Sequence, residues 1–192
     1  MEKRVCVLLA PGYEEIEALT PVDYLRRAGA LVDVISTIED IAVPGAHQVL
    51  VQADSFLEDI KPEDYDMVVI PGGLPGVPNL LANAKVLAFV KEMADQDKWV
   101  TSLCAGPSVL DHAGVLVNKC TTCYPGWEGE LKNIGSFSED TVVVDGKVIT
   151  SRGPGASGYF ALALVEALFG AEKAEEVKKA VIMDVVEKNL GL

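Results

Sequence analysis

The sequence predicts an α/β protein built on a doubly wound, mostly parallel sheet that is sandwiched by helices and carries one small β-hairpin. Short, continuous apolar runs at residues 5–9 and 67–70 are typical of strands that are buried on both faces of a parallel sheet. Helical segments alternate with the apolar runs, as the βαβ units of such a sheet require. Asp145 and Gly146 lie between two β-rich segments, which indicates a tight hairpin.

Apolar runs and turn residues delimit the strands along the chain. The predicted strands cover residues 5–9, 31–36, about 49–51, 67–70 and 99–103, and the hairpin pairs 141–144 with 148–150. Pro11 and Gly12 end the first strand, and the turn at 71–73 ends the strand at 67–70, because proline and glycine interrupt regular structure.

Helical periodicity and glycine stops delimit the helices. The predicted helices cover residues of about 14–28, 84–96, a stretch that opens after Cys104, about 155–169, and a last one from about 171. Gly29 and Gly170 supply two of the stops. The last helix is expected to carry Val177, Val181 and Val185 on one stripe.

Length and charge limit the classes of function. The 192 residues fit one domain spanning 1–192. A formal net charge of -13 argues against nucleic acid or an anionic membrane as partners, because both attract clustered lysine and arginine. The first apolar stretch is too short for a signal peptide, and no run is long enough to span a bilayer. We therefore expect a cytoplasmic protein whose four cysteines are reduced thiols.

Cys104 is the most informative residue, because it follows the strand at 99–103 and opens the next helix. In doubly wound sheets the ligand crevice lies at the carboxyl ends of the strands, so residues 11–17, 72–76 and 104–107 should meet there. Backbone N–H groups and the positive end of a helix dipole stabilise an anion. The sequence therefore predicts that the thiolate of Cys104 is favoured over the thiol.

Glu17 is predicted to face the core. Steps of about 100° per residue along the helix place Glu15, Asp23 and Arg26 on one side and Glu17 on the largely uncharged side. A dehydrated carboxyl has a raised pKa and, when protonated, can donate a hydrogen bond to a thiolate. The alternative is a slightly rotated helix that leaves Glu17 at the solvent boundary.

Gly72 and Gly73 form a turn that permits close approach of the backbone. If the turn faces Cys104, the N–H of Gly73 and that of Cys104 or Ala105 would form an oxyanion pocket for a substrate carbonyl. The alternative is a plain exit from a strand into a loop. Neither a dinucleotide-binding fingerprint nor a phosphate-binding loop is present, so we expect no cofactor.

Four stretches of sequence point to a known family. They are residues 10–17 (APGYEEIE), 70–73 (IPGG), 104–107 (CAGP) and 150–155 (TSRGPG). In these stretches, and nearly end to end, the chain resembles the ThiJ/PfpI superfamily, most closely the branch of the Parkinson-disease-associated protein deglycase and its bacterial relatives. The resemblance implies a flavodoxin-like sandwich, usually a homodimer. It also implies that Cys104 is the reactive cysteine, Glu17 its protonated partner, and Gly73 a backbone donor.

The chain departs from the family pattern where a histidine base is often found. That branch carries a histidine shortly after a Thr-Thr pair, whereas here Thr121 and Thr122 are followed by Cys123 and Tyr124. The peptidase branch has histidine directly after the nucleophile, where this chain has Ala105. Peptidase or amidase chemistry through a Cys–His pair is therefore disfavoured.

Four residues are secondary candidates. By the resemblance, Cys123 and Tyr124 lie in the segment that faces the site, although incidental packing is the alternative for the C-x-x-C spacing that Cys123 shares with Cys120. His47 is either a surface residue or a rim residue of a partner's site. Arg152 either pairs with a carboxylate near the site or bridges structural elements. No metal site is predicted, because no second Cys or His pair accompanies the motif.

The resemblance implies glyoxalase activity without glutathione, so the leading hypothesis is an enzyme that acts on small α-oxoaldehydes such as methylglyoxal and glyoxal, or on their adducts. The Cys104 thiolate would attack the aldehyde, Glu17 would relay a proton, and water would release a hydroxy acid without metal or cofactor. The alternative is an oxidative-stress sensor or chaperone in which Cys104 becomes a sulfinic acid. A cysteine peptidase or amidase is the third hypothesis.

Overall fold

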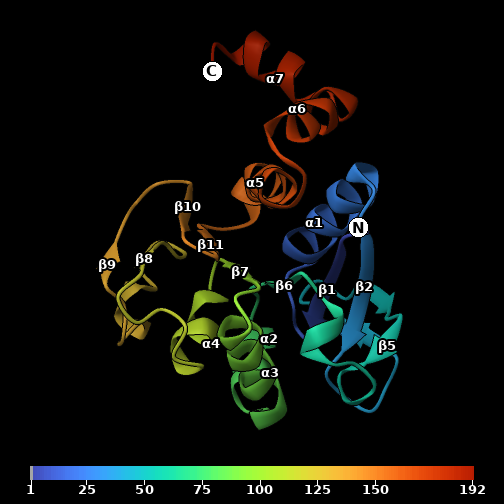
Figure 1. The fold of residues 1–192 in the computed structure, drawn as a ribbon, viewed down its shortest axis with the longest axis vertical. Helices are drawn as coiled ribbons and strands as arrows, with labels where there is room; N and C mark the ends of the chain where they lie inside the picture. Colours follow the sequence, from blue (N-terminus) through green and yellow to red (C-terminus); the bar gives the residue numbers. More distant parts are fainter. Residues whose placement is uncertain (1) are drawn as a thin grey trace.

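The computed structural model describes residues 2–192 and confirms the predicted α/β architecture (Figure 1). Its main sheet has seven strands, in the spatial order β10 (Val142–Asp145), β11 (Val148–Ser151), β7 (Trp99–Leu103), β6 (Met67–Ile70), β1 (Arg4–Leu9), β2 (Leu31–Ser36) and β5 (Ser55–Phe56). Neighbours are parallel except for β10 and β11, which form the hairpin predicted at Asp145 and Gly146.

Helices cover both faces of this sheet. One layer contains α1 (Glu15–Ala28) and α5 (Ser157–Phe169), and the other contains α2 (Gly76–Leu81), α3 (Ala84–Asp95) and α4 (Pro107–His112). Val5 and Val7 of β1 pack into the first layer, whereas Cys6 and Leu8 pack into the second. Burial on both faces explains why β1 is a continuous apolar run. Within residues 2–192, no helix combines the length and the apolar character that a bilayer crossing requires.

The register of the parallel strands brings three strand ends together. Val7 of β1 pairs with Val69 of β6, and Ile70 at the end of β6 pairs with Ser102 of β7. The segments that follow these strands therefore leave the sheet side by side. Because β2 lies on one side of β1 and β6 on the other, the topological switch point falls between β1 and β6. The segments that were predicted to meet, residues 11–17, 72–76 and 104–107, come together at this place.

Two small sheets flank the main one. They are formed by β3 (Ala42–Pro44) with β4 (Leu50–Gln52), and by β8 (Cys120–Thr121) with β9 (Ser136–Phe137). Only a short strand near residues 49–51 was expected in the first of them, because Pro44 in the partner strand weakens its β signal. A bridge between Gly45 and Tyr13 joins this hairpin to the segment before α1.

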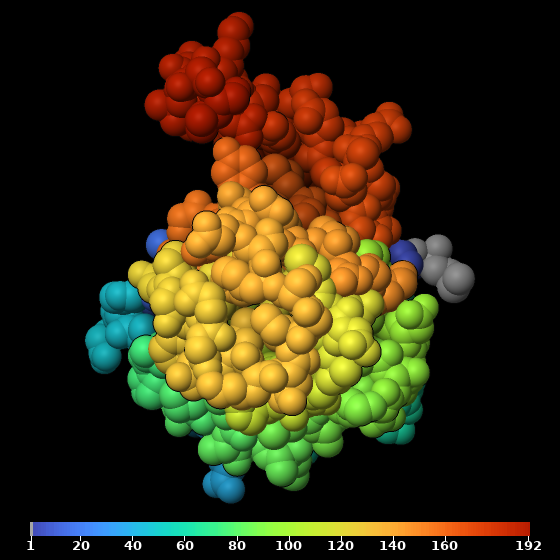
Figure 2. Space-filling model, turned by 90° about the vertical axis from the view of Figure 1, so that its left-hand side faces the viewer, coloured from blue at the N-terminus to red at the C-terminus, as the bar shows by residue number. Residues whose placement is uncertain are grey.

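The end of the chain corrects the prediction of one final helix. The chain forms two helices, α6 (Ala171–Ala180) and α7 (Met183–Leu190), which rise from the body in Figure 2. Between them Ile182 adopts a left-handed conformation (φ 57), and Met183 then lies against Gly158 at the start of α5. Because of this turn the chain does not continue as one straight helix, and Met183 can pack against α5. The predicted valine stripe is therefore interrupted, with Val177 buried and Val185 48% exposed.

Candidate active site

Cys104 lies at a sharp elbow between β7 and α4. Its backbone is left-handed (φ 61), a conformation that costs a non-glycine residue on the order of 1–3 kcal/mol. The N–H of Cys104 donates to the carbonyl of Ser151 (3.0 Å), and its carbonyl accepts from the N–H of Tyr124 (2.9 Å). Backbone on both sides therefore holds the strained elbow in place.

The groups that face the sulfur differ from those expected. Helix α4 has six residues and begins at Pro107, three residues after Cys104, so the thiol does not lie at the helix N-terminus. The N–H groups of Ala105 and Gly73 interact with the sulfur instead. Of the two donors that the sequence left open beside Gly73, Ala105 is the one available, because the N–H of Cys104 is bound to Ser151.

Glu17 is completely buried next to this elbow, as helix geometry predicted. Its Oε2 accepts a hydrogen bond from the N–H of Gly72 (2.8 Å), whereas Oε1 is buried and has no hydrogen-bond partner among residues 2–192. Gly72 separates the two side chains so narrowly that a Cβ there would lie 2.6 Å from Glu17 Oε2 and 2.7 Å from Cys104 Cβ. One carboxyl oxygen is therefore free of hydrogen bonds, while the carboxyl group interacts with the Cys104 side chain.

Burial governs the protonation of both groups. It raises the pKa of Glu17 to about 7, an increase that interactions with Cys104 and with the N–H of Gly72 only partly oppose. Burial also raises the pKa of the Cys104 thiol, and the negative charge of Glu17 raises it further. The expected lowering of the Cys104 pKa is therefore wrong, because desolvation and the carboxylate outweigh the backbone N–H groups. Above about pH 7 the pair holds one proton, and the thiolate forms when this proton is on Glu17.

Alanine at position 72 should disrupt this arrangement. The new Cβ would meet Glu17, Cys104 and, at 3.1 Å, the backbone nitrogen of Ala105. We expect Gly72→Ala to lower the free energy of unfolding by about 1–3 kcal/mol, as overpacking does, and to abolish activity. Denaturant titration and the turnover assay described below measure both effects. Gly155→Ala is the matched control, because no atom lies within 4 Å of a Cβ there, and equal stability of the two variants would contradict the prediction.

His47 is tied to the start of α1. Glu15 accepts the backbone N–H of His47 (2.7 Å) and lies 2.8 Å from its Nδ1. These bonds bury Glu15, which the sequence had placed on the charged side of the helix, because the β3–β4 hairpin covers that side. The bond to Glu15 also raises the pKa of His47. The side chains of Glu14, Glu15 and His47 place three ligand atoms within 4.8 Å of one another. Among the described residues, this is the arrangement that could hold a cation.

The remaining candidates surround the elbow. Tyr124 binds the carbonyl of Cys104 through its N–H, and its ring lies over Gly153. Cys123 is fully buried, and burial raises its pKa to about 11. Arg152 follows β11 and forms no ion pair within 4.0 Å among residues 2–192. Its Nη1 is buried and has no partner in this part of the chain. Arg152 therefore neither pairs with a carboxylate near the site nor bridges structural elements through an ion pair.

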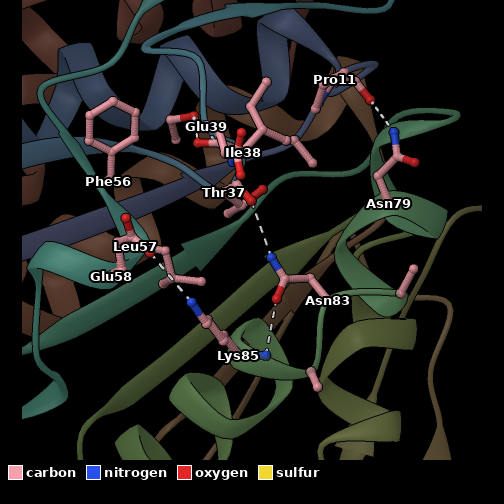
Figure 3. Close-up of a pocket in the computed structure, with 14 residues that line it drawn as sticks. Pro11, Thr37, Ile38, Glu39, Phe56, Leu57, Glu58, Asn79, Asn83 and Lys85 are labelled. Atoms are coloured by element: carbon pink, nitrogen blue, oxygen red, sulfur yellow. Dashed lines mark hydrogen bonds and ion pairs between the residues drawn. The ribbon is translucent and has the colours of Figure 1, made fainter.

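A cavity of about 620 Å³ lies at the ends of β1 and β2 (Figure 3). Asn79 donates to the carbonyl of Pro11 (2.8 Å), and Asn83 donates to the carbonyl of Thr37 (3.1 Å). These bonds fix α2 and the start of α3 to the segments that follow β1 and β2. The sequence did not predict this cavity, because its lining comes from several separate segments.

Comparisons with known proteins agree with this geometry. A model of the DJ-1/PfpI family matches residues 3–167. The chain belongs to the DJ-1/PfpI family. A Danio rerio protein named Parkinson disease protein 7 homolog is 40% identical over 184 residues, which cover 94% of this chain and 97% of the relative. A Pyrococcus abyssi protein named deglycase is 33% identical over 153 residues, covering 79% and 91%. The crystal structure of Drosophila melanogaster DJ-1beta is 37% identical, with a TM-score of 0.91 and coverage of 95% and 98%.

Family membership confirms the resemblance and the fold. In this DJ-1/PfpI chain the elements position Cys104, Glu17, Gly73 and Ala105 together. The carbonyl of Ser151, which holds the Cys104 N–H, was not predicted. Ser151 lies inside the TSRGPG stretch, which is the one feature of the sequence that could have pointed to it. Because Ser151 acts through its backbone carbonyl, the identity of its side chain does not indicate this role.

Proposed function

We propose that this DJ-1/PfpI protein is a cysteine-dependent glyoxalase that converts small α-oxoaldehydes, such as methylglyoxal and glyoxal, to hydroxy acids without glutathione. The observation that carries the proposal is the burial of Glu17 directly beside Cys104, which puts an acid of raised pKa next to a nucleophile. The name of the Pyrococcus abyssi deglycase supports adducts of these aldehydes as further substrates.

The reaction begins when the Cys104 thiolate attacks the aldehyde carbon while Glu17 holds the proton. The N–H groups of Ala105 and Gly73 stabilise the developing oxyanion, which Glu17 then protonates to give a hemithioacetal. The Glu17 carboxylate next removes the proton from the former aldehyde carbon, which leaves an enediolate, and returns this proton to the neighbouring carbon. The hydroxyl proton on the former aldehyde carbon moves to the oxygen of the neighbouring carbon, so that oxygen becomes the hydroxyl group and a carbonyl remains next to the sulfur. The product is a thioester of the hydroxy acid, and water hydrolyses it to release the acid and regenerate the thiol. One water is consumed, and the two carbons exchange oxidation levels.

The test uses purified protein and methylglyoxal without glutathione or any other added thiol. We expect lactate to appear in equal amount to the methylglyoxal consumed, measured by chromatography of both compounds over time. Consumption of methylglyoxal without lactate would indicate stoichiometric modification of the protein and would overturn the proposal. Lactate that appears only when glutathione is added would overturn it as well.

Oxidation sensing is the second candidate function. The Ala105 and Gly73 N–H groups and the free oxygen of Glu17 would also stabilise an oxidised Cys104 sulfur, and Cys104 is only half-buried. The peptidase hypothesis lacks comparable support. His47 is bound to Glu15, and His112 Nδ1 lies 2.8 Å from the carbonyl of Ser108.

We further propose that the protein acts as a homodimer through the surface around the start of α1. Ile16 of α1, Leu50 at the start of β4 and Val49 just before it are apolar and between 48% and 64% exposed. Glu15 of α1 accepts hydrogen bonds from the N–H groups of His47 and Val49. The start of α1, with Ile16, and the segment with Val49 and Leu50 therefore belong to one region of the surface. Light scattering after size-exclusion chromatography should give the mass of a dimer, and Leu50→Asp should shift it toward the monomer. A monomeric wild-type protein would contradict the proposal.

A further inference from the structure

Cys123 lies on the backbone segment that is joined directly to Cys104. The N–H of Tyr124, the residue after Cys123, donates to the carbonyl of Cys104 at 2.9 Å. Cys104 is not extended, but only this hydrogen bond and one peptide unit separate its backbone from that of Cys123. A disulfide spans a Cα separation of roughly 4.4–6.8 Å. The two cysteines are therefore backbone neighbours at a separation of the order that a disulfide spans.

The two thiols differ in their access to solvent. Both are free, but Cys104 is half-buried at the site, whereas Cys123 is 0% exposed. A small oxidant therefore reaches Cys104 first. A thiol that is shielded from solvent yet adjacent to an oxidised sulfur is placed to react with that sulfur and not with the oxidant.

The other two cysteines are held elsewhere. The backbone N–H of Cys120 donates to Asp145 at 2.8 Å, which ties Cys120 to the β10–β11 hairpin. The thiol of Cys6 is buried in β1 and lies 3.7 Å from the carbonyl of Met67. Neither residue shares the backbone bond that links Cys123 to Cys104.

We propose that Cys123 resolves oxidised Cys104 by forming an intramolecular Cys104–Cys123 disulfide. In the first step the Cys104 thiolate gives two electrons to a hydroperoxide. The O–O bond breaks, the S–O bond of a sulfenic acid forms, and an alcohol or water leaves. In the second step the sulfur of Cys123 attacks the Cys104 sulfur. The S–S bond forms, the S–O bond breaks, and water carries away the oxygen and the thiol proton. A dithiol reductant returns two electrons and restores both thiols.

This inference goes beyond the proposed glyoxalase activity and does not depend on it. The disulfide would withdraw the nucleophile reversibly and would prevent the further oxidation of Cys104 to sulfinic acid, which thiols do not reverse. Cys123 would then be a redox partner of Cys104.

Disulfide mapping tests the proposal. Reduced wild-type protein is treated with one equivalent of hydrogen peroxide, free thiols are alkylated, and the protein is digested with trypsin without reductant. Cleavage after Lys119 and Lys132 places Cys104 on one peptide and Cys120 with Cys123 on another, so the Cys120→Ser variant is mapped in parallel to identify the linked thiol. We expect mass spectrometry to find the two peptides linked, two hydrogen atoms lighter than their sum, and separated again after dithiothreitol.

Two variants provide the comparison. Cys120→Ser removes the neighbouring thiol of the same C-x-x-C motif and should leave the linked pair intact. Cys123→Ser should lose it and accumulate several-fold more sulfinic acid on Cys104 at the same peroxide dose, with Cys123→Ala as a second variant. Absence of the linked pair in wild-type protein, a Cys120–Cys123 link in its place, or equal sulfinic acid in wild type and Cys123→Ser would each overturn the proposal. Mapping of Cys120→Ser, in which Cys123 is the one thiol of its tryptic peptide, decides the question even if the Cys123 variants unfold.

Discussion

Replacing Cys104 by serine is expected to lower the turnover of methylglyoxal to lactate by at least about a thousandfold, because removal of a nucleophile leaves only binding and electrostatic contributions. Serine has nearly the same size, so the elbow and its bonds to Ser151 and Tyr124 should persist. Its hydroxyl is far less acidic than a thiol and does not form the anion that attacks the aldehyde. Lactate formation and methylglyoxal loss at saturating substrate measure the effect.

Cys120→Ser is the matched control for this prediction. Cys120 lies in β8 and is tied to Asp145, away from the Cys104 elbow, so its replacement should leave turnover within about twofold of wild type. Thermal unfolding of both variants checks that they are folded. Comparable lactate formation by Cys104→Ser and wild type would remove Cys104 from the mechanism.

Replacing Glu17 by glutamine is expected to lower turnover at pH 7 by about 10²–10⁴-fold, the range typical of a lost general acid–base group. In the wild type, activity should fall as the pH drops below about 7, because both members of the Cys104–Glu17 pair are then protonated and no thiolate forms. Glu17→Gln has no carboxyl to titrate at this position and should not show the fall in activity below about pH 7. Its activity should rise only in the alkaline range, where the buried thiol itself loses its proton. The pH dependence of kcat/KM for both proteins measures this difference.

The same substitution has a pH-dependent effect on stability. The pKa of Glu17 is raised in the folded state from 4.5 to about 7, so protonation favours folding. This contribution is fully present below pH 4.5 and is lost as the pH rises through about 7. Since each pH unit in this window is worth about 1.4 kcal/mol, the change amounts to about 3 kcal/mol. Wild type should therefore lose stability relative to Glu17→Gln between these two pH values.

Glu58→Gln serves as control for both measurements, because Glu58 is exposed and forms a surface ion pair with Lys85. Neither the pH profile of activity nor the pH dependence of the unfolding midpoint should change in this variant. An inflection near pH 7 that persists in Glu17→Gln would assign it to another group and would contradict the shared-proton mechanism.

Local patterns were sufficient for most of the fold. Burial on both faces makes β1 and β6 continuous apolar runs, and Asp145 with Gly146 specifies the hairpin. The prediction was wrong where long-range packing overrides local periodicity. Ile182 breaks the last helix so that Met183 can pack at the start of α5, and the β3–β4 hairpin buries Glu15 on a helix face that looks exposed in the sequence.

The sequence by itself indicated the family, the proposed nucleophile and its proposed acidic partner, because sequence motifs and helical periodicity are local properties that can be read without coordinates. Only the tertiary structure decided the protonation of the site and its backbone donors. The pKa of Cys104 depends on desolvation and on the charge of Glu17, and both arise from segments that the parallel register brings together. The same holds for the backbone bond between Tyr124 and Cys104, on which the proposed Cys104–Cys123 disulfide depends. Burial and through-space electrostatics are properties of the packed chain, so no single stretch of sequence encodes them.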